Sequence, residues 1–467
     1  MTRTATIALL LAFCLPSMGS AAEDDSTEET SAEETSTGKK QEKRALPDYD
    51  GRPKQDQAGK RGALWVPRVM MFPFWALWEG TARQPIGAVA TQMEKDEVAE
   101  KVTEVLTFGT GGKVFLYPTA MLDFGFRPSI GVTLAVNGPP DGAGRTRIQF
   151  ATGGRKWWLL SARQRFFVAG APEDNNPWTA TQVGFGFLFS QRPDQVFRGI
   201  GTDTAGPRTR FFRERFAADV VTELVFGELD GLRLFFEVER NRFGAGRLRR
   251  NPSIETVYDV ADSREVPRFT TGYAAAATGA RLSLDSRKAR PANGSGLRIE
   301  PFVELHAELA EGGFRSLFFG GEAALFGDFG GNRVIGLRGW MGAVEPLSEG
   351  KLLPFTEYVE LGGNEVMRGF PQGWFRGLSG AVATLQYTWP IWVYVDGLLF
   401  VEAGGAFGRR FDDFDPDNTA LSFGMGLRSN QDRDSAFTAH VALGTARFGD
   451  RPGIDSVRLV VGTDRGF

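Results

Sequence analysis

The chain has 467 residues with a formal net charge of -3, and 42% of its residues are hydrophobic and 24% charged. No long run of Lys and Arg is present, so a nucleic-acid partner is not expected. A helical membrane protein needs about 20 consecutive apolar residues per span, and no stretch beyond the first residues supplies them. The 39 Phe and 59 Gly instead favour an all-β protein with an apolar outer wall and many tight turns.

Residues 1–22 have the features of a secretory signal peptide. Arg3 provides a positive start, an apolar run covers residues 5–15, and small residues at 20–22 suit cleavage. A buried N-terminal helix is the alternative. The only cysteine, Cys14, lies inside this segment, so the processed protein is expected to contain neither a disulfide nor a Cys-ligated metal.

Residues 23–60 are a low-complexity segment in which Asp and Glu alternate with Ser, Thr and Ala before Lys and Arg reverse the sign. Such a segment has too little apolar surface to fold on its own. We expect a disordered periplasmic tether. Electrostatic binding of this segment to a partner is the alternative.

Residues 61–112 form a different kind of segment, which we expect to be amphipathic and to lie at the periplasmic mouth of the protein. The Trp-rich stretch 64–78 is too short to span a bilayer, and Pro67 and Pro73 prevent a continuous helix. Residues 93–106 have valines at helical spacing with Glu and Lys between them, which predicts a short helix.

From residue 113 onward the hydrophobic pattern changes to a period of two, which is typical of β-strands. One face of each predicted strand is apolar, and the other carries Gly, Arg and Glu. A soluble β-sandwich would seldom place such residues in its dry core, whereas a transmembrane barrel faces lipid on one side and a polar lumen on the other. The alternation is clearest in residues 183–189, 232–239, 421–428, 437–444 and 457–462.

The length of residues 113–467 fixes the approximate size of the barrel. At roughly 22 residues for each strand with its connection, this span holds about 16 strands. An even number returns both ends of the chain to the same side of the membrane. The predicted fold is therefore an all-β transmembrane antiparallel β-barrel of about 16 strands, preceded by a short helical segment.

Three segments resemble the BamA/TamA superfamily, also called the bacterial surface antigen family. They are LGGNEVMRGF at 361–370, LQYTWPIW at 385–392 and LFVEAGG at 399–405. The resemblance implies that a long loop folds back into the lumen and that its Arg meets an acid on the inner wall. The matching residues are Met367, Arg368, Gly369 and Phe370 at the loop tip, and Phe400, Glu402 and Gly404 on the wall.

The period of two supports the wall motif independently, because it places Phe400, Glu402 and Gly404 on one strand face. The alternative for Arg368 is an ordinary solvated loop arginine.

Further segments fit the same resemblance. Residues 197–204 are similar to a family turn, and residues 282–300 are similar to a strand–loop–strand unit with Asp285 and Arg287. Gly462 and the terminal Phe467 match the C-terminal assembly signal of outer-membrane barrels, whereas Arg465 stands where that signal has an aromatic residue.

The resemblance implies an outer-membrane barrel of a Gram-negative bacterium that takes part in the insertion or translocation of outer-membrane proteins. Its expected partners are outer-membrane lipid, client proteins and a periplasmic partner. Family members that handle unfolded clients carry periplasmic POTRA modules, for which residues 61–112 are too few. A barrel-only member is therefore expected, and a passive pore or structural barrel without client handling is the alternative.

No catalytic centre is predicted, and the protein is not expected to be an enzyme or to need a cofactor or metal. Only two histidines occur, His306 and His440, and the second falls on a lumen-facing strand position. Residues 109–113 lack the spacing of a phosphate-binding loop. Residues 413–417 resemble a calcium loop, but Gly and the distal Glu of that motif are missing, so a polar surface loop is favoured.

Overall fold

The computed structural model describes most of the chain from residue 107 onward. The expected signal peptide, the tether and the predicted helix at 93–106 lie outside the described residues, as do residues 464–467. The described residues are 107–108, 113–123, 125–138, 144–169, 180–201, 206–227, 229–248, 251–262, 264–287, 294–330, 333–392, 395–429 and 437–463.

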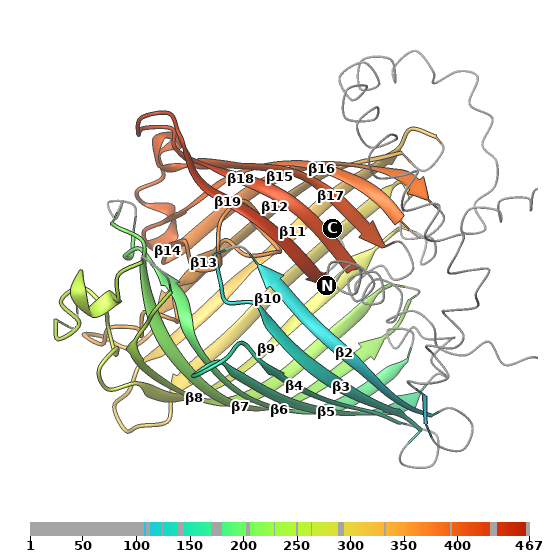
Figure 1. Ribbon diagram of the computed structural model, residues 1–467, viewed down its shortest axis with the longest axis horizontal. Helices are drawn as coiled ribbons and strands as arrows, with labels where there is room; N and C mark the ends of the chain where they lie inside the picture. Colours follow the sequence, from blue (N-terminus) through green and yellow to red (C-terminus); the bar gives the residue numbers. More distant parts are fainter. Residues whose placement is uncertain are drawn as a thin grey trace, which may run out of the picture.

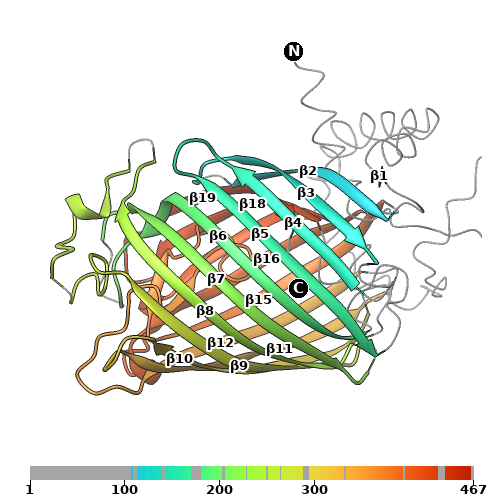
Figure 2. The same ribbon diagram turned by 90° about the horizontal axis from the view of Figure 1, so that it is seen from below.

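A single antiparallel sheet closes on itself to form a barrel (Figures 1 and 2). Sixteen strands pair in chain order around it, and the last strand also pairs with the first. The antiparallel barrel and its strand number, both predicted from the sequence, are confirmed. The strands are β2 (Val114–Asp123), β3 (Ser129–Asn137), β4 (Gly144–Thr152), β5 (Trp158–Ala169), β6 (Thr181–Phe197), β7 (Thr209–Val225), β8 (Gly231–Ala245), β9 (Tyr273–Asp285), β10 (Gly296–Glu308), β11 (Arg315–Asp328), β12 (Val334–Pro346), β15 (Ser379–Trp392), β16 (Val395–Phe407), β17 (Ala420–Ser429), β18 (Phe437–Arg447) and β19 (Ile454–Thr463).

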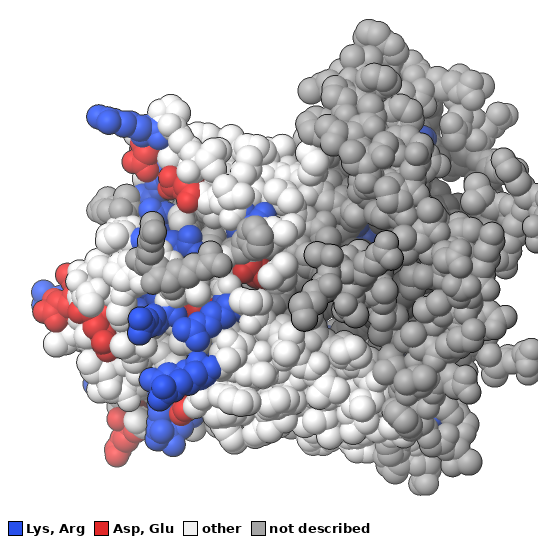
Figure 3. All heavy atoms as spheres, in the orientation of Figure 1, with Lys and Arg blue, Asp and Glu red and all other residues white. Residues whose placement is uncertain are grey.

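The two ends of the barrel differ in their connections. At the terminal end, where β2 begins and β19 finishes, the connections include ones as short as 226–230, 329–333 and 393–394. The opposite end, here called the loop end, carries the long connections 246–272 and 347–378. Charged side chains gather at the loop end in the space-filling view (Figure 3). This asymmetry gives the barrel a polar end.

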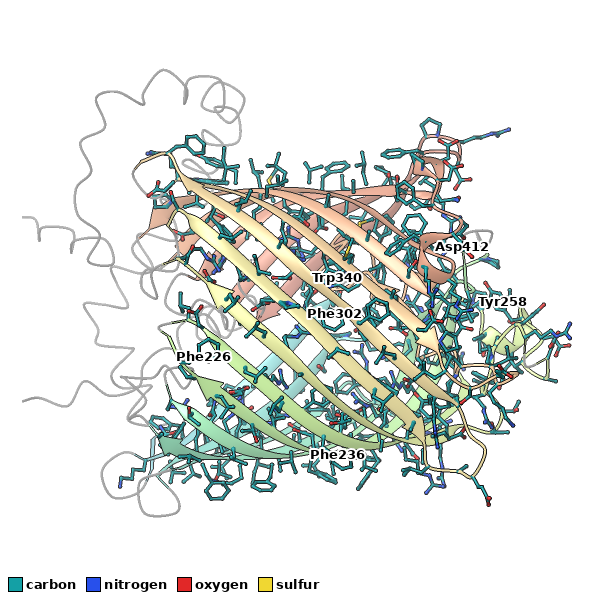
Figure 4. The ribbon with its side chains drawn as sticks, turned by 180° about the vertical axis from the view of Figure 1, so that it is seen from behind. Phe226, Phe236, Tyr258, Phe302, Trp340 and Asp412 are labelled. Atoms are coloured by element: carbon teal, nitrogen blue, oxygen red, sulfur yellow. The ribbon has the colours of Figure 1, made fainter. Side chains whose placement is uncertain are left out.

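The outer wall of the barrel is apolar because alternate residues of each strand face outward. In β8, Leu234 and Phe236 are 41% and 50% exposed, whereas Glu239 faces the lumen and is 8% exposed. Phe236 stands on the wall in Figure 4, and a belt without charged residues occupies the middle of the visible face in Figure 3. The sheet closes on itself, and its apolar belt suits lipid, so the barrel is of the transmembrane type.

In the part of the chain that the structure describes, no helix has both the length and the apolar character needed to cross a membrane.

The connection between β12 and β15, residues 347–378, folds into the lumen and is here called the plug. It contains a hairpin of β13 (Val359–Leu361) and β14 (Phe375–Gly377). Its apolar side chains pack against lumen-facing residues such as Val196 and Val382. The plug thus provides the apolar core that a polar-lined barrel lacks, through Leu353, Val359, Leu361, Val366, Met367, Phe370, Trp374 and Phe375.

The connection between β8 and β9, here called the cover, packs over the plug at the loop end. It contains the 3-10 turn η4 (Ile254–Thr256). Ile254 of the cover and Phe355 of the plug share a buried cluster with wall residues. The Phe355 ring lies 5.6 Å from the Phe197 ring and 5.0 Å from the Phe211 ring, measured between centroids. The plug is therefore enclosed between the wall and the cover.

Candidate functional site

Arg368 lies at the tip of the plug with its side chain directed onto the inner wall, where it is 9% exposed. Its Nε donates to Oε1 of Glu402 at 2.9 Å, and its backbone N–H donates to Oε2 of Glu402 at 2.5 Å. Its Nη1 donates to Oε1 of Gln386 at 2.9 Å. Glu402 on β16 is fully buried. The structure thus places Arg368 in the lumen and not in solvent.

The wall beneath Arg368 also contributes an aromatic ring. The guanidinium carbon of Arg368 lies 3.6 Å from the ring centroid of Phe400, which is 2% exposed. Phe400 and Glu402 occupy alternate positions of β16, so both face the lumen. A desolvated cation over an aromatic face is stabilised by about 2 kcal/mol. The arginine is therefore held by a carboxylate, an amide and a ring.

Gly369 allows the tip to approach the wall closely. Its backbone N–H donates to Oγ of Ser422 at 2.7 Å, and this hydroxyl donates to Oε2 of Glu402 at 2.7 Å. A Cβ at Gly369 would lie 2.3 Å from the carbonyl oxygen of Leu443 on β18. A side chain at this position would therefore lift the tip from the wall.

Met367 and Phe370 fix the shape of the tip. Met367 has a φ of 54°, in the left-handed region, and its carbonyl accepts the N–H of Phe370 at 2.9 Å, which closes a tight turn. Phe370 is fully buried against Gly444 of β18, where a Cβ would lie 2.6 Å from the ring. Gly404, the third residue of the wall motif, packs against β15, because a Cβ there would lie 2.4 Å from the carbonyl oxygen of Ala381.

Arg458 on β19 connects the tip of the plug to the first strand of the barrel. Its side chain is 1% exposed. Its Nη1 donates to the carbonyl oxygens of Gly363, Arg368 and Phe370 at 2.5, 2.8 and 3.0 Å. Its Nε and Nη2 donate to the carboxylate of Asp123 at 3.2 and 2.7 Å. One side chain of the last strand thus holds both the tip and the end of β2.

The seam between β2 and β19 is short. Among the described residues its register has two paired positions, Asp123 with Val460 and Leu122 with Val461. Every other pair of neighbouring barrel strands has eight to fifteen. At the terminal end, β2 pairs instead with the two-residue strand β1 (Thr107–Phe108), which precedes the barrel start expected from the sequence. The seam has the fewest backbone pairs in the barrel.

A second polar contact holds the plug near the loop end. Oε2 of Glu357 lies 2.8 Å from Nδ1 of His306 on β10, and the Tyr273 hydroxyl donates to Oε1 of Glu357 at 2.5 Å. Burial raises the pKa of Glu357, but the hydrogen bonds and the positive charge around it outweigh burial, so this pKa lies below the usual value of 4.5. Glu357 is therefore anchored in its ionised form.

The other residues singled out in the sequence lie elsewhere. Asp285, the last residue of β9, forms an ion pair of 2.8 Å at the terminal end with Arg287 of the connection that follows, and the Arg287 guanidinium lies 3.8 Å from the Phe326 ring centroid. Gly462 belongs to β19 and pairs with Thr438. Phe467 lies outside the described residues. Asp285, Arg287 and Gly462 are not brought to the tip of the plug.

The acidic segment considered as a calcium loop lies between β16 and β17, near Asp412 in Figure 4. Asp413 accepts the backbone N–H of Gly408 at 2.5 Å. Asp415 accepts that of Asp417 at 2.9 Å and begins the 3-10 turn η6 (Pro416–Asn418). These two carboxylates accept hydrogen bonds from backbone N–H groups of their own loop. In the described part of the chain, no group of three or more His, Cys, Asp or Glu is arranged to hold a metal ion.

Arg458 and Asp123 were not recognised in the sequence as site residues. The alternation in 457–462 places Arg458 on the lumen face, and this was the one available signal. Its partner is 335 residues away, so no local spacing connects the two. Ser422 and Gln386 were missed for the same reason, because each lies on a different strand from the residues that it supports.

A closed sheet of sixteen strands, a lipid-facing belt and a lumen plug seated by a buried Arg–Glu pair define a plugged transmembrane β-barrel. Comparison with solved structures finds BamA from Haemophilus ducreyi lacking POTRA domains 1–3, at 12% identity and a TM-score of 0.52. The alignment covers 75% of this chain and 70% of that one. The chain has the fold of the BamA barrel.

Two further structures match less well. CdiB from Acinetobacter baumannii has 10% identity and a TM-score of 0.45, and CdiB from Escherichia coli has 12% identity and a TM-score of 0.46. They cover 76% and 74% of this chain, which spans 60% and 62% of theirs, less than two thirds. No model of a known protein family matches the sequence, and no protein of curated function does.

Proposed function

We propose that this protein is a member of the BamA/TamA superfamily that helps to insert proteins into the bacterial outer membrane or to translocate them across it. The observation that carries the proposal is the seating of Arg368 on Glu402 inside the lumen. This contact joins the two motifs on which the resemblance of the sequence rests. The BamA fold of the barrel supports it.

The seam supplies the physical route for such an activity. With two paired positions between β2 and β19, opening the seam breaks fewer backbone hydrogen bonds than opening any other strand pair. An unpaired edge in lipid costs several kcal/mol per group. A strand of an incoming client would pair with this edge and remove the cost, as in β-strand addition. Arg458 would keep the seam closed until then.

The proposal also assigns a location, an orientation and partners. The barrel would lie in the outer membrane with its terminal end toward the periplasm and its charged loop end outside (Figure 3). Residues 1–22 would direct export, and residues 23–60 would remain in the periplasm as a tether. The partners would be outer-membrane lipid, unfolded barrel proteins and a periplasmic protein that delivers them. The protein would have no enzymatic role.

The direct test uses liposomes that contain the purified full-length protein. An unfolded eight-stranded barrel protein is added, and its insertion is followed by its heat-modifiable migration on gels. Faster insertion than into liposomes with an equal amount of an unrelated porin supports the proposal. Equal rates in both, with stable ion conductance through this barrel, would instead show a passive pore. The plug packed against the inner wall disfavours a wide open channel.

A further inference from the structure

Two arginines share the indole ring of Trp374 at the loop end. The guanidinium carbons of Arg198 and Arg208 lie 4.3 and 5.5 Å from the ring centroid of Trp374. Trp374 belongs to the plug and is 5% exposed, whereas the arginines stand at either end of the connection between β6 and β7. Two like charges thus lie near the same ring.

The charge of this pair is poorly balanced by acids. Arg198 has an ion pair with Asp455 at 3.7 Å, and that carboxylate is 38% exposed. Within the described residues, no carboxylate lies within ion-pair distance of Arg208, and Nη2 of Arg208 donates to the carbonyl oxygen of Gly125 at 3.4 Å. Burial first, and then the charge of Arg198, lower the pKa of Arg208. The site therefore has an excess of positive charge.

Three buried groups in the same region, each able to donate, have no hydrogen-bond partner among the residues that the structure describes. They are Nε of Arg208, Nε1 of Trp374 and the hydroxyl of Tyr258. Tyr258 comes from the cover and lies at the loop end in Figure 4. Its hydroxyl lies 2.2 Å from a Cβ built on Gly206, whose carbonyl accepts Nε of Arg198 at 3.1 Å. The hydroxyl therefore lies close to Arg198. A buried donor left unpaired is destabilising.

We propose that Arg198, Arg208, Trp374 and Tyr258 bind a phosphate group. Each of the three unpaired groups can donate a hydrogen bond, so a ligand that supplies acceptors can pair all of them, and the excess charge favours an anion. A phosphate offers more acceptor oxygens than a carboxylate, and guanidinium groups match its geometry. The phosphate would come from a lipid headgroup at the membrane surface or from a soluble compound. The bound phosphate would join Trp374 of the plug, Tyr258 of the cover, and Arg198 and Arg208 beside the ends of β6 and β7.

The first arm of the test titrates inorganic phosphate into the full-length protein in a non-ionic detergent by calorimetry. Arg208→Gln removes a charged donor and should weaken binding about 10- to 100-fold. Trp374→Phe and Tyr258→Phe each keep an aromatic ring at the position and remove one neutral donor. Each should therefore weaken binding about 2- to 10-fold. Arg155→Gln, an exposed arginine at the same end, is the matched control and should bind normally.

The second arm uses nanodiscs of phosphatidylcholine with or without phosphatidic acid. If a lipid headgroup is the ligand, phosphatidic acid raises the Tm of the wild-type barrel and does not raise that of Arg208→Gln. If only inorganic phosphate binds, the ligand is soluble. Heat-modifiable migration confirms that each variant is folded. The proposal is overturned if neither probe has an effect on the wild type, or if Arg208→Gln and the two conservative variants respond as the wild type does. This test does not depend on client insertion.

Discussion

Replacing Glu402 with Gln should release the tip of the plug. The carboxylate of Glu402 is fully buried and accepts three hydrogen bonds, from the Arg368 backbone, the Arg368 side chain and Ser422. The change leaves the Arg368 charge without a counter-ion in a dry site. Removing one partner of a buried ion pair costs about 3–5 kcal/mol. We take a loss of about 3 kcal/mol, because the Gln oxygen still accepts one hydrogen bond. The population in which the tip has left the wall then rises about 150-fold.

Thiol labelling measures this population. The single native cysteine, Cys14, lies in the predicted signal peptide, so Val366→Cys provides one thiol at a buried position of the plug. Its labelling rate with a maleimide follows the open fraction when reclosing is fast. Glu345→Gln is the control, because its partners Arg409 and Arg410 are exposed. Such surface pairs contribute about 0–1 kcal/mol, so labelling should change less than about sixfold.

A double-mutant cycle decides whether the pair acts as a unit. Arg368→Ala should increase labelling to a similar degree as Glu402→Gln, and the double variant should be little worse than either single one. Fully additive effects, or a labelling rate in Glu402→Gln equal to that of the control, would refute the reasoning.

Further predictions concern the seam, acid and the chain ends. Arg458→Gln should both speed labelling of the plug and lower the Tm of the barrel, whereas Asp123→Asn should lower the Tm with less effect on labelling. The folded pKa of Glu357 lies below 4.5, so its contribution to stability is complete above that pH and is lost as the pH falls through the folded pKa. Plug labelling should therefore rise in acid, and Glu357→Gln should flatten this dependence. Deleting residues 23–60 should leave heat-modifiable folding intact because the segment has no apolar face, whereas deleting 457–467 should abolish it.

The barrel itself could be predicted because its signal is local. Alternation in stretches such as 232–239 depends on neighbouring residues of one strand, and the structure has the same faces outward. The contact between Arg368 and Glu402 could also be anticipated, because the sequence resemblance supplied the pair and the alternation placed Glu402 on the lumen face.

The remaining contacts depend on segments that meet only in the closed barrel. Arg458 reaches Asp123 because the last strand returns to the first, and no periodicity encodes which residues then face each other. The cluster around Trp374 combines the plug, the cover and the connection between β6 and β7. Arg208 and Tyr258 lie in irregular connections, where neither hydrophobic period fixes the direction of a side chain.

The most direct test of the proposed function is to lock the seam. Leu122 and Val461 are register partners on β2 and β19, and directly opposed residues of antiparallel strands have Cα atoms about 4.5–5.5 Å apart, within the range of a disulfide. The variant Leu122→Cys/Val461→Cys should lose client insertion in liposomes when oxidised and regain it after reduction, while each single variant stays active. Client insertion by the oxidised double variant at the rate of the reduced one would contradict the account.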